Sequence, residues 1–331
     1  MTLIEKSLPT SFRPNPWTRS GVTIMKDATT NPDLAMRQAG LNWQVNRVDL
    51  RTADTLDPVP EFAAIRRSDN NSILGVVGAD YSCFQNASMF DVFKDLASVD
   101  GGLPFTIETA GSFQRGRIVW AMAHLPDLGI RIGDDESKTY LLVSNGHTGN
   151  RTLIIAPTTI RVICQNTLRM AESQIRGRTG LAGGFILKHT PGIHAAVADA
   201  KAAFAATIKA HATTKEAWHH LASKPLSARL EKDFLTAVFG KPGPDEAERA
   251  KTIRKHREGR LSEILASPTS QVSGTKDSAY SLLNAVTEWI DHERTTRGAE
   301  NADEGRLFSA TMGSGSVLKE KAWGAIMDLV A

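Results

Sequence analysis

The sequence has little of what identifies a secreted or membrane protein. Only two of its 331 residues are cysteines, Cys83 and Cys164. Both lie among apolar or aromatic neighbours, so we expect two free buried thiols and no disulfide framework. No run of eighteen apolar residues occurs, which argues against a transmembrane helix. The first residues, MTLIEKSLPTSFRPNPW, contain an acid and prolines but no long apolar region, unlike a secretory signal. These absences predict a cytoplasmic protein without a membrane partner.

The common catalytic motifs are also missing. The chain has no closely spaced cysteine pair, no His-Glu-x-x-His and no Gly-x-Ser-x-Gly, so zinc and α/β-hydrolase chemistry have no support. The segment GSGSVLKEK (313–321) lacks the spacing of a phosphate-binding loop and has no strand before it. We therefore predict no cofactor.

The composition is that of a folded, weakly basic protein. Hydrophobic residues make up 41% and charged residues 23% of the chain, and the formal net charge is +3. The length allows one large or two modest domains with a substantial core. A charge of this size neither requires nor excludes nucleic acid, because binding depends on local clusters of charge.

The first region, residues 1–60, is predicted to be irregular except for a short helix around 31–41. Strand patterns begin after it. Two apolar runs within 62–78 are separated by Asp69 to Ser72, which indicates a hairpin. Residues 88–99 have apolar side chains at helical spacing. Further strands are predicted within 104–125 and 129–157, around turns at 111–116, 134–138 and 145–150. Residues 61–190 therefore predict a mixed core built on an antiparallel sheet.

The second half of the chain has a helical pattern. Residues 194–222 are rich in alanine and strongly favour a helix. Further helices are predicted within 241–265 and 277–297, and a last one starts near Ser316. With the strands confined to residues 61–190 and helices filling 191–331, the predicted fold class is α+β.

The stretch RVICQNTLRM (161–170) suggests how the protein acts. If residues 158–176 form a helix, one face is apolar and the other is a polar stripe. The stripe consists of Arg161, Gln165, Arg169, Glu172 and Arg176. Such stripes usually face solvent, but a row of guanidinium groups also suits the oxygens of a phosphate backbone. Arg115, Arg117 and Arg151 belong to neighbouring strands and loops. Nearby Phe113 and Trp120 would either stack on bases or pack in the core.

A second pattern allows an enzymatic alternative. Asp127 precedes Glu136 and Lys138 at a spacing similar to that of metal-dependent nucleases. In such an enzyme the two carboxylates would hold Mg²⁺ and Lys138 would polarise the attacking water. The same segment, GDDESK, is also typical of a solvent-exposed hairpin turn. His147, in a predicted turn, has no partner that the sequence identifies.

Six blocks of the chain resemble the phage/plasmid-like protein family, whose shared domain has no assigned function. They are LGVVGADYSCFQN (74–86), GRIVWAMAHLP (116–126), SNGHTGNRTLIIAPTTIRVICQNTL (144–168), LKHT (187–190), LLNAVTEWIDHER (282–294) and KEKAW (319–323). The likeness extends over nearly the full chain. It implies a mobile-element context, in which DNA processing is frequent.

A weaker likeness concerns architecture alone. Antiparallel hairpins followed by a basic-faced helix are similar to the core of ring-forming single-strand annealing proteins. That likeness implies binding of single-stranded DNA between sheet and helix, through backbone charge and not through base recognition.

Our first hypothesis is a homo-oligomeric protein that binds and anneals single-stranded nucleic acid. Its predicted contact residues are Arg161, Gln165, Arg169, Arg176, Arg115, Arg117 and Arg151. The alternatives are a metal-dependent nuclease using Asp127, Glu136 and Lys138, and a non-enzymatic protein that binds a partner.

Overall fold

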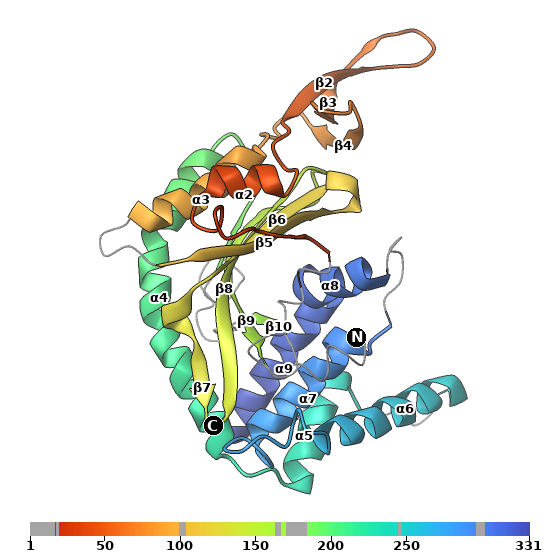
Figure 1. Cartoon of the computed structure of the whole chain (residues 1–331). Coiled ribbons are helices and arrows are strands. Elements are labelled where there is room, and N and C mark those ends of the chain that lie inside the picture. The colour runs from red at the N-terminus through yellow and green to blue at the C-terminus, as the bar shows by residue number, and fades with distance from the viewer. Residues whose placement is uncertain are drawn as a thin grey trace.

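The protein is α+β: an antiparallel sheet lies between N-terminal helices and a helical C-terminal part (Figure 1). The computed structural model describes residues 17, 20–98, 104–162, 167–169, 184–241, 243, 247–295 and 302–331. Only the backbone is described for residues 96–98, 167–169 and 204–214. Within these ranges no helix combines the length and the apolar character that a membrane span requires.

The large sheet confirms the predicted antiparallel hairpins. Its strands run in the order β1-β5-β6-β8-β9-β10, with β7 beside β8 and β11 beside β9. They are β1 (Val22–Thr23), β5 (Thr106–Phe113), β6 (Ile118–His124), β7 (Ile130–Ile132), β8 (Asp135–Gly146), β9 (Leu153–Arg161), β10 (Thr167–Arg169) and β11 (Phe185–Leu187). Each described pairing is antiparallel, and short turns join β5 to β6, β7 to β8 and β8 to β9.

A small sheet of β2 (Val45–Arg51), β3 (Pro58–Arg67) and β4 (Ile73–Gly78) projects from one end of the molecule (Figure 1). The β3–β4 hairpin was predicted from its polar turn and is confirmed. Strand β2 was not predicted, because its apolar residues, Val45, Val48 and Leu50, do not alternate regularly with polar ones and the region is rich in turn-forming residues.

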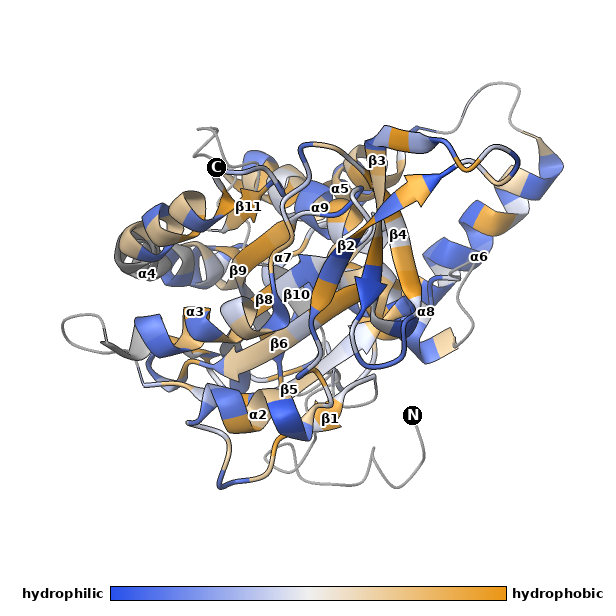
Figure 2. Cartoon of the chain, turned by 90° about the horizontal axis from the view of Figure 1, so that it is seen from above, coloured by the Kyte–Doolittle hydropathy of each residue, from blue (hydrophilic) through white to orange (hydrophobic). Residues whose placement is uncertain are grey.

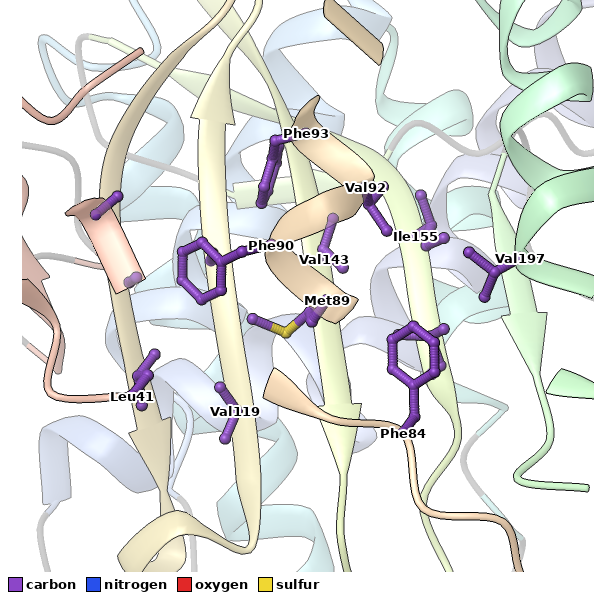
Figure 3. Packing of buried hydrophobic residues seen from close by; sticks show 14 of the residues in the cluster. Leu41, Phe84, Met89, Phe90, Val92, Phe93, Val119, Val143, Ile155 and Val197 are labelled. Atoms are coloured by element: carbon purple, nitrogen blue, oxygen red, sulfur yellow. The ribbon is translucent and has the colours of Figure 1, made fainter. Parts of the chain in front are cut away.

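Helices α2 (Pro32–Gln38), α3 (Asn86–Ser98) and α4 (Ile193–Ser223) lie along one side of the large sheet (Figure 1). Alternate residues of neighbouring strands, among them Val119 and Val143, pack against Met89, Phe90 and Phe93 of α3 (Figure 3). The opposite face of the same strands packs around Trp17. Side chains therefore cover both faces of the central strands, which explains why β6 reads as a nearly continuous apolar run and why the middle of β8 (140–143) is apolar throughout.

The C-terminal helices form a second core. They are α5 (Ala228–Phe239), α6 (Glu248–Leu265), α7 (Ala279–His292), α8 (Ala302–Met312) and α9 (Ser314–Val330). Trp218, Phe234, Leu283 and Trp323 are buried together there, and Ile130 of β7 joins them. The predicted helical C-terminal half is thus confirmed, and α9 begins at Ser314, close to the predicted start near Ser316.

The predicted helix over 158–176 is wrong where the structure describes it. Residues up to Arg161 belong to β9, and β10 pairs antiparallel with it, placing Thr167 opposite Ile160. Consecutive β-branched residues (Thr158, Thr159 and Ile160) favour a strand, and short apolar runs fit either period. The described residues 158–161 and 167–169 are therefore strands and not the basic-faced helix on which the annealing-protein likeness depended. The predicted turn at 134–138 is also shorter than expected, since β8 already begins at Asp135.

Candidate functional site

The arginine at the centre of the first hypothesis is a core residue. Only 3% of the Arg161 side chain is exposed, and that of Asp135 is fully buried. Nε and Nη2 of Arg161 lie 2.6 and 2.5 Å from Oδ2 of Asp135. The guanidinium also lies 5.8 Å from the centre of the Tyr280 ring. Arg161 therefore ties β9 to β8 and α7, and the prediction that it contacts phosphate from an open surface is wrong.

The structure describes no side chain for the other predicted contacts of the stripe, Gln165, Arg169 and Arg176. Arg169 lies in β10, for which only the backbone is described. Gln165 and Arg176 lie outside the described residues. Phe113 and Trp120 are completely buried and pack with Trp17, so they belong to the core and do not stack on bases.

Three of the predicted arginines are exposed and share one end of the large sheet. Arg115 and Arg117 lie at the β5–β6 turn, and Arg151 follows the β8–β9 turn. The two turns are joined, because the backbone N–H of His147 donates to the carbonyl of Arg117 at 2.8 Å. Arg151 packs closely against Gly146, because a Cβ added to this glycine would overlap the Cβ of Arg151. The Arg151 guanidinium lies over the Phe308 ring, 5.0 Å from its centre. We call Arg115, Arg117 and Arg151 the turn arginines.

The β5–β6 turn has a strained backbone. Gln114, Arg115 and Gly116 have φ angles of 52°, 59° and 95°, so three consecutive residues are left-handed. Each such residue other than glycine costs on the order of 1–3 kcal/mol and persists only where its surroundings enforce it. Two distant side chains do so here. Nη1 of Arg67 donates to the carbonyl of Arg115 at 3.2 Å, and Oε1 of Glu304 accepts the N–H of Gln114 at 2.8 Å.

A buried histidine, His147, is linked to this turn through contacts with neighbouring side chains. His147 is fully buried, and its Nε2 lies 3.0 Å from Oδ1 of Asn86. Since Nδ2 of Asn86 donates to the carbonyls of Leu41 and Trp43, its Oδ1 is the acceptor and His147 Nε2 carries the proton. The His147 ring contacts the Trp43 ring edge-on at 5.5 Å, and the Arg67 guanidinium covers Trp43 at 4.2 Å. A continuous set of contacts thus links His147 to Arg67, which holds Arg115.

A second histidine lies close by. His189 stacks on Tyr81 with ring centres 4.8 Å apart, and its Nδ1 lies 3.1 Å from the carbonyl of Ser82. The Tyr81 hydroxyl donates to the carbonyl of Gly146 at 3.0 Å. Asn145, also buried, donates to the carbonyl of Phe84 at 2.8 Å. We call Tyr81, Asn86, Asn145, His147 and His189 the buried polar cluster.

The cluster is uncharged near neutral pH. Burial lowers the pKa of His147 to about 3, and the nearby His189 and Arg67 add to this effect. Burial also lowers the pKa of His189. Within the described residues, His147 Nδ1, His189 Nε2 and Asn145 Oδ1 have no hydrogen-bond partner, and all three are acceptors. The neighbouring Cys83 is a free, half-buried thiol whose pKa burial raises, so it is not an activated nucleophile.

His147 makes the stability of the fold depend on pH. Its pKa is about 3 in the folded protein and near 6.5 in the unfolded chain. Between these values only the unfolded chain binds the proton, so the free energy of unfolding falls as the pH is lowered. We expect His147 to account for about 2 kcal/mol of loss between pH 7.5 and pH 5. Urea denaturation of the His147→Asn variant should show a shallower pH dependence by this amount.

The matched control is His219→Asn, at an exposed histidine of α4. This variant should keep the pH dependence of the unmodified protein. An unchanged pH dependence in His147→Asn would show that the histidine is not buried in its neutral form.

The residues of the nuclease alternative lie on different elements of the described structure. Asp127 is exposed in the short 3₁₀ helix η4 (Pro126–Leu128). Glu136 and Lys138 lie on one face of β8, where Glu136 is opposite Arg131 of β7. Across the described parts of the chain, no group of three or more His, Cys, Asp or Glu side chains is arranged to hold a metal ion.

The sequence patterns did not predict that the residues of the buried polar cluster lie together, although His147 was considered as a single residue. Asn145 and His147 lie two residues apart around the end of β8, and Tyr81 and Asn86 belong to another segment. Amide and histidine side chains inside apolar runs were the only sign in the sequence that these polar residues would be buried. Their convergence depends on pairings between distant segments, which local patterns do not reveal.

One comparison with known proteins gives a result. A family model described as "Domain of unknown function (DUF932)" matches residues 73–311. No significant match was found among curated proteins or among solved structures. The matched range holds the turn arginines and the whole buried polar cluster, and it covers well over half of the chain. The chain therefore belongs to the family that this domain of unknown function, DUF932, defines.

Proposed function

We propose that the protein binds single-stranded nucleic acid through its phosphate backbone, without reading the sequence, and that the turn arginines make the contact. The observation that carries this proposal is the left-handed turn at Gln114–Gly116, which is held in place by Arg67 and Glu304. Strained backbone of this kind concentrates at functional sites. Here it fixes the positions from which Arg115 and Arg117 extend.

The chemistry of the turn arginines suits phosphate. A guanidinium group presents planar N–H donors that match phosphate oxygens, and it remains charged at any physiological pH. Arg151 is positioned by its contact with Phe308, and the two turns are joined through His147. A surface whose backbone is already ordered loses less entropy when it binds.

The proposal includes the annealing activity, the homo-oligomeric state and the cytoplasmic location that the sequence led us to expect. Contact with the backbone leaves the Watson–Crick edges of the bases available for a complementary strand. That is the property an annealing protein needs. No described residue gives comparable support to the nuclease alternative.

The test is a variant in which all three turn arginines are replaced by Gln. Glutamine removes the charge but tolerates the turn as Gln114 does, since that residue already has a φ of 52°. Each phosphate contact contributes about 0.7 to the slope of log affinity against log salt for single strands. We expect this slope to fall by about 2, and affinity at low salt to fall by about two orders of magnitude. Fluorescence anisotropy with a short labelled oligonucleotide measures both.

A control variant removes three exposed charges elsewhere, at Arg37, Arg229 and Lys241. It should lower the affinity much less. Unchanged binding by the turn variant would refute the assignment of this surface. Strand cleavage in Mg²⁺ that Glu136→Ala abolishes would establish the nuclease instead.

A further inference from the structure

The small sheet exposes an apolar face. Phe62, Ile73 and Val76 are 51%, 50% and 53% exposed. Val48 of β2, Ala64 of β3 and Val76 of β4 are directly paired, so their side chains form one row on this face. Figure 2 shows hydrophobic segments along these strands. Contiguous apolar surface of this kind on a projecting element is typical of an interaction site.

Strand β2 also presents a free edge. The sheet order is β2-β3-β4, so β3 covers only one side of β2. Gln85 accepts from the N–H of Val45 at 3.0 Å and donates to its carbonyl at 2.9 Å, so the backbone groups of Val45 point away from β3. Because these groups alternate along a strand, those of Arg47 and Asp49 point outward too. In the described part of the chain, the backbone N–H and C=O groups of Arg47 and Asp49 have no hydrogen-bond partner.

The charges on this edge are self-complementary in a register centred on Val48. If two copies of β2 pair antiparallel about an axis through Val48, Arg47 of each copy lies opposite Asp49 of the other. Both residues have outward backbone groups, so each of these pairs exchanges two N–H···O bonds. An axis through Arg47 or Asp49 places like charges opposite each other, which disfavours those registers. The Arg47 guanidinium is already positioned, because its Nη1 donates to the carbonyls of Ala79 and Tyr81 at 2.8 and 2.7 Å.

We propose that a second copy of this chain pairs with β2 in this register. The two small sheets then form one continuous sheet across the two-fold axis, and the apolar rows of the two copies become continuous. The contact is isologous, so the same strand serves both partners and the assembly closes as a dimer. The pairing does not depend on nucleic-acid binding, because the turn arginines lie on other elements.

The test uses two charge-reversal variants of the full chain, Arg47→Asp and Asp49→Arg. Each alone places like charges opposite each other at both ends of the pairing. We expect dimerisation of either variant, measured by sedimentation at micromolar concentration, to weaken at least about tenfold relative to the unmodified chain. A mixture of the two restores opposite charges in both pairs, so we expect a heterodimer of nearly native affinity.

The rescue keeps the proposal falsifiable, because a variant that had failed to fold could not form the heterodimer. A monomeric unmodified chain would overturn the proposal. It would also be overturned by a dimer that both reversals leave unchanged, or by a mixture that fails to pair. A monomer whose Arg47 and Asp49 amides are protected from hydrogen exchange would instead show that a segment of the same chain covers this edge.

Discussion

Replacing Arg161 by Met is expected to lower the free energy of unfolding by about 3–5 kcal/mol. The substitution leaves the carboxylate of Asp135, which is completely buried, without its guanidinium partner. Water cannot replace that partner without opening the packing between β8, β9 and α7. The phenol of Tyr280 lies beside the pair, and its pKa is raised by burial and by the charge of Asp135. Urea denaturation followed by circular dichroism measures the loss.

Two further variants separate the ion pair from general damage to the fold. In Arg161→Met with Asp135→Leu both charges are removed, and we expect most of the lost stability to return, because the cost arises from the unpaired charge. Arg131→Met, at an exposed arginine of the neighbouring β7, should change stability by less than about 0.5 kcal/mol. A fully stable Arg161→Met protein would mean that the guanidinium faces solvent, and Arg161 would again be a candidate phosphate contact.

Replacing Lys319 by Met should have an effect of similar size, about 3–5 kcal/mol. Nζ of Lys319 lies 2.7 Å from Oδ1 of Asp291, and the two side chains are 2% and 4% exposed. This pair joins α9 to α7 inside the C-terminal core. Loss of the ammonium group leaves a buried carboxylate between two helices, and we expect the helical part to unfold at a lower urea concentration.

The control for this pair is Lys232→Met, at an exposed lysine of α5, which should leave stability nearly unchanged. The double variant Lys319→Met with Asp291→Leu should recover most of the loss. If Lys319→Met alone is harmless, Asp291 is either solvated or satisfied by other groups, and α7 and α9 are held by apolar packing alone.

The sequence predicted much of the fold because many of its signals are local. The polar turn at 69–72, the helical spacing of 88–99 and the alanine-rich start of α4 each specify an element without reference to distant residues. Residues 158–161 were wrongly predicted as helix because a short apolar run fits both the helical and the strand period. A helical reading aligned Arg161 with Arg169. The β8–β9 pairing instead places Arg161 opposite Ser137, two residues from Asp135 in β8.

The candidate site was predictable only in part. The turn arginines were recognised because they are charged and lie near turns. The left-handed backbone that positions Arg115 depends on Arg67, 48 residues away, and on Glu304, 190 residues from Gln114. Contacts of this range follow from the packing of complete elements, and no short pattern contains them.

The bond between Gln114 and Glu304 has a consequence for biosynthesis. The β5–β6 hairpin leaves the ribosome long before α8 is made, yet its turn lacks one of its two side-chain supports until residue 304 has emerged and folded back. Nascent chains shorter than this would carry Arg115 and Arg117 on a turn without its support from Glu304. If the turn arginines bind phosphate as we propose, that competence is acquired late in translation.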